Sequence, residues 1–194
     1  DSGHLPELLN TTHVEVLALF TKPSPGGYLP VRVKIANNLK NDSRVRLDFE
    51  SKSGYGNDLV ARSSFSFDTS RGKTTTRDIV VPLSPFGDSY NGANVTARLS
   101  GSMGTAENSI RTSIDRGQPA VLLSEALFTP NASLLDSALS GKFSGSRGGS
   151  SEFAAKFDPK QLPDDWLAFS GYDSMIMTDA DWTNIPPGAR NAIL

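Results

Sequence analysis

The chain has 194 residues, of which 37% are hydrophobic, so it can supply the core of one large or two small domains. Its 19 Lys and Arg residues are balanced by 21 Asp and Glu residues and are scattered along the chain, which argues against a nucleic-acid-binding surface. Cysteine is absent, which excludes disulfides, thiolate nucleophiles and zinc-thiolate sites. No stretch approaches about 18 continuous apolar residues, so we expect membrane contact only through segments outside this chain.

The first part of the chain has the pattern of an antiparallel β-sandwich. In RVRLDFES the apolar Val45, Leu47 and Phe49 alternate with charged residues, which predicts a strand with one buried face and one solvent-exposed face. Clusters of Gly, Pro, Asn and Asp separate the segments that show this pattern. We expect seven strands, within residues 13–20, 28–38, 44–51, 59–68, 73–83, 94–102 and 106–114. This spacing favours an immunoglobulin-like sandwich over residues 1–117.

The pattern changes after residue 117. PAVLLSEAL is a continuous apolar run, which is typical of a strand buried on both faces, and TPNASLLDSALSG places Leu residues at helical spacing. EFAAKFDP and YDSMIMT predict two further short strands, and Pro186 and Pro187 mark the entrance of a last helix. The order of these elements predicts a mostly β protein in which residues 118–194 form a partial parallel α/β (Rossmann-like) unit.

We expect this second unit to be cut short at its C-terminus. Its last helix ends at Ile193 and Leu194 without a cap or a following strand, and a parallel sheet needs cover on both faces. Either the sandwich packs against the sheet and completes it, or residues beyond Leu194 do, and we favour the second alternative.

The C-terminal segment GYDSMIMTDADWTNIPPGARNAIL resembles uncharacterised bacterial membrane-anchored proteins, in which a β-sandwich precedes a glutamine-amidotransferase-like (flavodoxin-like) α/β domain. The resemblance covers residues 118–194. It implies that Gly171, Tyr172 and Asp173 open a central strand, that Trp182 packs at the end of this strand, and that the next helix carries Arg190 and Ile193. Amidotransferases need a nucleophilic cysteine, which this chain lacks, so the resemblance implies a place in the cell envelope and no reaction.

Asp179, Asp181 and Trp182 are the best candidates for a ligand site. They follow the last predicted strand, and the carboxyl ends of parallel strands line the ligand crevice of such sheets. Carboxylate oxygens there could bind a hard cation or a sugar. The alternative, which we favour, is that both Asp residues cap the loop and the following turn, while Asp164 or Asp165 caps the LPDDW helix. We expect neither a cofactor nor a metal ion, because two carboxylates alone do not make a calcium loop.

Two tyrosines are candidates for contact with a partner. Tyr55 and Tyr90 lie in Gly-rich loops at the predicted ends of the sandwich, and loops on a rigid sandwich commonly supply binding surfaces. A Ser-His-Asp site would need His4 or His13, and neither has a recognisable catalytic context.

Four N-x-[ST] triplets occur, as expected by chance in a chain rich in Asn, Ser and Thr. They begin at Asn10, Asn41, Asn94 and Asn131.

We therefore expect a non-catalytic interaction or scaffold module of a bacterial cell-envelope protein, in the periplasm or on the extracytoplasmic face of the membrane. Its sandwich would contact a protein partner. The alternative is a carbohydrate-binding or carbohydrate-processing module with a site at Asp179, Asp181 and Trp182. This alternative predicts stabilisation by a saccharide or a divalent cation.

Overall fold

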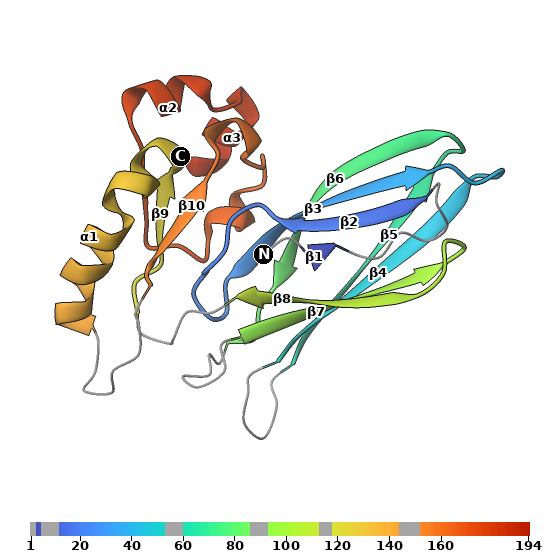
Figure 1. Cartoon of the computed structure of the whole chain (residues 1–194), viewed down its shortest axis with the longest axis horizontal. Helices are drawn as coiled ribbons and strands as arrows, with labels where there is room; N and C mark the ends of the chain where they lie inside the picture. The colour runs from blue at the N-terminus through green and yellow to red at the C-terminus, as the bar shows by residue number, and fades with distance from the viewer. Residues whose placement is uncertain (1–2, 5–11, 53–59, 86–92, 113–117, 144–151) are drawn as a thin grey trace.

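The computed structural model describes residues 3–4, 12–52, 60–85, 93–112, 118–143 and 152–194. The protein is mostly β, and its N-terminal part consists of two four-stranded antiparallel sheets (Figure 1). The first sheet has the order β1-β2-β3-β6, with β1 (Gly3–His4), β2 (His13–Ala18), β3 (Tyr28–Asn37) and β6 (Lys73–Pro82). The second has the order β5-β4-β7-β8, with β4 (Ser43–Lys52), β5 (Ala61–Thr69), β7 (Ala93–Gly101) and β8 (Ala106–Thr112).

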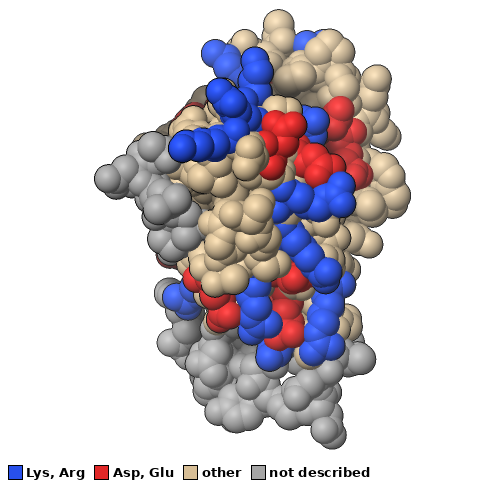
Figure 2. Space-filling model, turned by 90° about the vertical axis from the view of Figure 1, so that its right-hand side faces the viewer, with Lys and Arg blue, Asp and Glu red and all other residues tan. Residues whose placement is uncertain are grey.

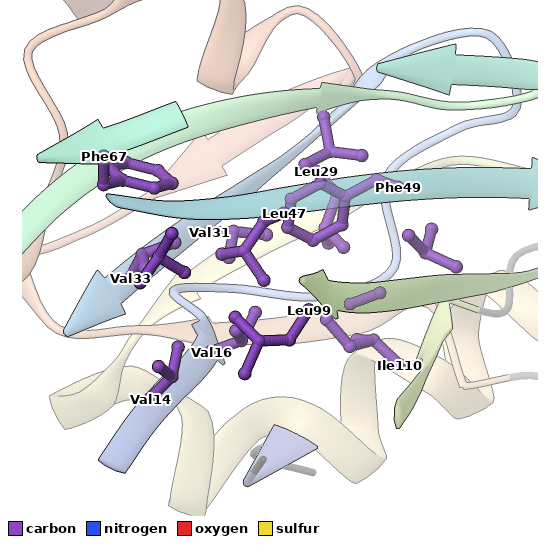
Figure 3. Close-up of a cluster of buried hydrophobic side chains, with 14 of the residues drawn as sticks. Val14, Val16, Leu29, Val31, Val33, Leu47, Phe49, Phe67, Leu99 and Ile110 are labelled. Carbon is purple, nitrogen blue, oxygen red and sulfur yellow. The ribbon is translucent and has the colours of Figure 1, made fainter. Parts of the chain in front are cut away.

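The two sheets share a core that the alternation in the sequence dictates. Val45, Leu47 and Phe49 of β4 are each at most 2% exposed, and Leu47 stands opposite Leu99 of β7 in the strand register. Side chains from both sheets meet between them (Figure 3). This confirms the mostly β fold and the buried face of the segment RVRLDFES.

The C-terminal part contains a small parallel sheet with the strand order β10-β9-β11. Its strands are β9 (Val121–Ser124), β10 (Ala154–Phe157) and β11 (Ser174–Ile176). One long helix, α1 (Glu125–Phe143), packs on one face of β9 and β10. The remaining elements are the 3-10 turns η1 (Pro159–Gln161) and η2 (Trp166–Phe169), and the helices α2 (Asp179–Asn184) and α3 (Pro187–Ile193).

Helix α1 starts earlier than the sequence indicates. The predicted strand over residues 119–127 ends at Ser124, and the helix begins directly at Glu125 and passes through Pro130. Pro130 lies in the second turn of the helix, where it removes one backbone hydrogen bond. The helix tolerates this loss because Phe128 and Leu135, on either side of Pro130, pack against the sheet.

The sandwich covers part of the other face of the parallel sheet. Phe20, which follows β2, is 2% exposed, and its ring centroid lies 5.7 Å from that of Phe169 and 5.4 Å from that of Tyr172. The Tyr172 hydroxyl donates a hydrogen bond to the Thr21 carbonyl (2.8 Å), and burial raises the pKa of this phenol well above its usual range. The sandwich therefore packs against this face of the parallel sheet.

Close backbone contact reinforces this junction. The Ser24 N–H donates to the Gly171 carbonyl (2.7 Å), and a Cβ atom on Gly27 would lie only 2.5 Å from the Gly171 Cα atom. Arg32 of β3 binds Asp78 through two hydrogen bonds, of 2.7 and 2.8 Å, and also contacts the Gln161 side chain. These contacts join the sandwich to the parallel-sheet unit.

Candidate functional site

The carboxyl end of the parallel sheet is occupied by the start of α2. Thr178 is the N-cap of this helix, and its hydroxyl accepts a hydrogen bond from the Asp181 N–H (3.1 Å). The Asp181 carboxylate accepts in return from the Thr178 N–H (2.9 Å), which completes a capping box. The sequence therefore fixes the helix start through a Thr and an Asp three residues apart.

Asp181 also ties α2 to the central strand of the sheet. Its Oδ2 atom accepts hydrogen bonds from the Ser124 hydroxyl at the end of β9 (2.7 Å) and from the Thr178 hydroxyl (2.8 Å). Ser124 is fully buried and Asp181 is only 9% exposed. The Ser124 hydrogen bond, followed by the Thr178 N–H, lowers the pKa of Asp181 below its usual range, because each favours the charged carboxylate.

The other two residues of the predicted site have different surroundings. The Asp179 side chain is exposed in the first turn of α2, where its negative charge interacts favourably with the helix dipole. Trp182 is half-buried and packs against the hydrophobic cluster between the parallel sheet and the sandwich. The Arg190 guanidinium lies 5.7 Å from the centroid of the Trp182 ring. Arg190 also donates to the carbonyls of Ile185 and Thr183, at 2.9 Å each, and so links α2 to α3. Asp181 and Trp182 therefore both take part in holding α2 in place.

The neighbouring acidic residues cap backbone groups as well. Asp165 caps η2 by accepting from the Leu167 N–H (3.0 Å), and Asp158 caps η1 by accepting from the Lys160 N–H (2.9 Å). Asp173 accepts from the Ala120 N–H (2.8 Å). Over the part of the chain that the structure describes, no three His, Asp or Glu side chains gather where they could hold a metal ion.

The other predicted contact residues, Tyr55 and Tyr90, lie outside the described residues. Asn10 lies outside them too, whereas Asn41, Asn94 and Asn131 have exposed side chains. His13 lies in β2, opposite Ala36.

The outer face of the second sandwich sheet carries a hollow that the sequence did not indicate. It has a volume of about 390 Å³ and is lined mainly by charged residues of β4, β5 and β7. Arg46 pairs with Asp48 (2.9 Å), and Arg62 pairs with Glu50 (2.9 Å). Basic and acidic side chains are likewise interleaved over the face seen in Figure 2. Phe49 also lines the hollow but is only 2% exposed, so its ring offers no platform for a sugar.

The Thr178–Asp181 capping box could have been found from the sequence, because TDAD fits the pattern of a Ser or Thr followed three residues later by an acid. The Ser124 hydrogen bond could not, since it joins residues far apart in the chain. It depends on the parallel pairing of β9 and β11, which places both strand ends at one edge of the sheet.

Comparison with known proteins assigns no family. No family model matches the chain, and no curated protein matches it either. Among solved structures, the sporulation control protein Spo0M from Bacillus subtilis shares 14% identity with a TM-score of 0.41, over 57% of this chain and 51% of Spo0M. A cycloisomaltooligosaccharide glucanotransferase from Paenibacillus, complexed with cycloisomaltoheptaose, shares 17% identity with a TM-score of 0.34, over 63% of this chain and 17% of the enzyme.

This chain thus spans about half the length of the first protein and under a fifth of the second. Neither likeness is strong enough to assign a function. Within the described residues, no helix combines the length and the apolar character needed to cross a membrane.

Proposed function

We propose that this chain is a non-catalytic interaction or scaffold module, in which the sandwich is a rigid carrier and the parallel-sheet unit offers the contact surface. The distribution of exposed apolar side chains supports this most directly. Among the described residues, every large hydrophobic side chain that is exposed lies in the C-terminal part, namely Leu134 (67%), Phe143 (44%), Trp166 (64%), Ile176 (42%) and Leu194 (93%). Contiguous patches of exposed apolar side chains mark interaction surfaces, so we propose that part of this set forms one.

The topology supports an immunoglobulin-like assignment for the sandwich. We number the strands β2 to β8 as the first to the seventh strand of the sandwich. The first, second and fifth strands (β2, β3 and β6) then share one sheet. The fourth, third, sixth and seventh strands (β5, β4, β7 and β8) share the other. Constant-type immunoglobulin domains have the same division of strands between the sheets except for the fourth strand, which in those domains pairs with the fifth. The sandwich would be a variant in which that strand has changed sheets.

The strand order of the parallel sheet supports a flavodoxin-like assignment. The second strand of the unit, β10, lies on one side of the first, β9, and the third, β11, lies on the other. Flavodoxin-like sheets begin with this order. The order also agrees with the resemblance to envelope proteins that carry an amidotransferase-like domain, and we propose a place in the bacterial cell envelope on that resemblance. A chain without cysteine would keep the scaffold of such a domain and not its reaction.

Cross-linking in the source cells tests this role. We would replace Ile176 by a photo-reactive amino acid and, as a matched control, replace Ser66, which is exposed on β5. We expect a discrete protein adduct at residue 176 and none at residue 66. Adducts of the same pattern at both positions, or at neither, would contradict a contact surface on the parallel-sheet unit.

The alternative, a carbohydrate module with Asp179, Asp181 and Trp182, has a separate test. Thermal unfolding with a panel of glycans and divalent cations should show no shift, because Asp181 is hydrogen-bonded within the protein and Arg190 lies over the Trp182 ring. A rise of several degrees that disappears in Asp179→Asn would favour the alternative, since a ligand of the folded state raises stability.

A further inference from the structure

Strand β11 has an unpaired edge. Among the described strands it pairs only with β9, through Ser174, Met175 and Ile176. Met175 packs into the cluster on the sandwich side of the sheet, whereas Ser174 and Ile176 are exposed on the opposite side. Strands of parallel sheets are normally buried on both faces. β11 is an apolar strand with one covered face and one uncovered face.

The opposite edge of the sheet is protected. Lys22, in the loop after β2, donates to the carbonyl of Ala154 in β10 (3.1 Å) and pairs with Glu152 (2.9 Å). A lysine at a sheet edge is a common device against pairing with another chain. Within the described residues, no lysine or arginine is bonded to Ser174, Met175 or Ile176 of β11. The β11 edge thus lacks the protection that the β10 edge has.

One flank of α1 lies over β10. The Asp136 carboxylate accepts hydrogen bonds from the N–H groups of Phe153 (2.8 Å) and Ala154 (3.1 Å), where β10 begins. Glu125 accepts from Lys156 of β10 (3.3 Å). Successive residues of a helix are rotated by roughly 100° about its axis. Glu125 and Asp136, eleven residues apart, therefore lie on the same flank of α1. These two contacts fix how the helix is rotated on the sheet.

The other flank of α1 therefore faces the β11 side. By the same rotation, the apolar residues Leu127, Leu134 and Ala138 lie on this flank together with Asn131 and Lys142, because the sheet order places β10 and β11 on opposite sides of β9. Leu134 is 67% exposed. We call Leu127, Leu134 and Ala138, together with Ser174 and Ile176, the β11 surface. It combines the open edge of β11 with the apolar residues on this flank of α1.

The charges at the ends of β11 favour one occupant. Asp173 precedes the strand, Asp179 follows it, and both side chains are exposed. Antiparallel pairing of β11 with a second copy would bring Asp173 of one copy toward the end where Asp179 of the other lies, and these like charges repel. A strand whose own ends are basic would instead be attracted at both ends.

We propose that the β11 surface binds an extended apolar strand with Lys or Arg at its ends, from a partner protein, as a fourth strand of the parallel sheet. This rests on the proposed function and names the surface and the chemistry of the partner. Backbone hydrogen bonds to the β11 edge hold the strand, and its alternate apolar side chains pack on Ile176 and Leu134.

Peptide binding tests the proposal. We would titrate the whole chain into the fluorescein-labelled peptide KKVTVIVKK, follow the anisotropy, and compare the acidic-ended peptide EEVTVIVEE. Ile176→Lys removes an apolar contact and adds a lysine at the edge, so we expect at least about tenfold weaker binding of the basic-ended peptide. Phe143→Lys is the matched control, because Phe143 is similarly exposed but lies on the flank over β10. It should leave the affinity unchanged, and the acidic-ended peptide should bind more weakly than the basic-ended one.

Three results would overturn the proposal. Ile176→Lys could bind as tightly as the original chain, the acidic-ended peptide could bind as tightly as the basic-ended one, or neither peptide could saturate the protein. Light scattering that shows a dimer of the original chain and a monomer of Ile176→Lys would assign the surface to a second copy instead. If the peptides fail while cross-linking in cells still finds a partner on the C-terminal part, the proposed function stands and the assignment of the β11 edge is wrong.

Discussion

Replacing Asp181 by alanine distinguishes a capping role from a ligand-binding role. The change removes the acceptor of two hydroxyls and one N–H, and Ser124, which loses one of these bonds, is fully buried. A buried donor without an acceptor costs about 1–3 kcal/mol, and loss of the capping interaction adds about 1 kcal/mol. We therefore expect Asp181→Ala to lower the free energy of unfolding by about 2–4 kcal/mol.

Urea unfolding measures this change, and Asp179→Ala is the matched control. Asp179 is exposed, so its removal should cost at most about 1 kcal/mol, from the interaction of its charge with the helix dipole. A loss below about 0.5 kcal/mol in Asp181→Ala, or a gain in stability, would refute the reasoning. Either result would point to a carboxylate kept for binding rather than for folding.

Three further predictions follow from the same contacts. The pKa of Asp181 is lower in the folded state than in the unfolded chain, where it is about 4. The ionised carboxylate therefore contributes its full stabilisation of the folded state above about pH 4, and this stabilisation is lost as the pH falls through the pKa of the folded state. The stability difference between the original chain and Asp181→Asn should therefore be larger at pH 7 than at pH 2.5, and a difference independent of pH would contradict this. Gly27→Ala should destabilise the protein by several kcal/mol in urea unfolding, since the added Cβ would lie 2.5 Å from the Gly171 backbone; an unchanged midpoint would show that the junction is loose. Phe20→Ala should cost about 3–5 kcal/mol in the same assay, because it empties a buried site between the sandwich and the parallel sheet; a change under about 1 kcal/mol would indicate that the two parts are not packed together.

The strands of the sandwich could be predicted because their pattern is local. In β4, alternate residues are apolar, and they form the core together with the residues opposite them in the register. The parallel strands and the Pro187 helix entrance could be predicted for the same reason. These features depend only on residues that are neighbours in the chain.

The junction between the two parts could not be predicted. Phe20 has the spacing of a strand residue in the sequence, yet it packs on Phe169 and Tyr172 in the second cluster. No local pattern records this choice, because it depends on which face of the parallel sheet α1 leaves uncovered. The same holds for the exposure of Ile176, which follows from the place of β11 at the sheet edge.

The sequence predicted where the residues of the candidate site lie in the fold, but not the contacts that they make. Asp179, Asp181 and Trp182 do lie just after the last strand, as the sequence indicated. The capping alternative named Asp residues as the caps, whereas Thr178 is the N-cap of α2 and Asp181 is its capping-box partner. The sequence does not show that a buried hydroxyl on β9 also binds this carboxylate.

Hydrogen exchange at β11 tests the central claim, that this strand edge is a contact surface, most directly. The Ser174 N–H is bonded to the Ala120 carbonyl, so the N–H of the next residue, Met175, points to the unpaired edge. In the free chain we predict fast exchange of the Met175 amide and slow exchange of the amides of β9. Saturation with the basic-ended peptide should slow the Met175 amide and leave the β4 amides unchanged. Exchange at Met175 that is already slow in the free chain, or that the bound peptide does not alter, would contradict the account.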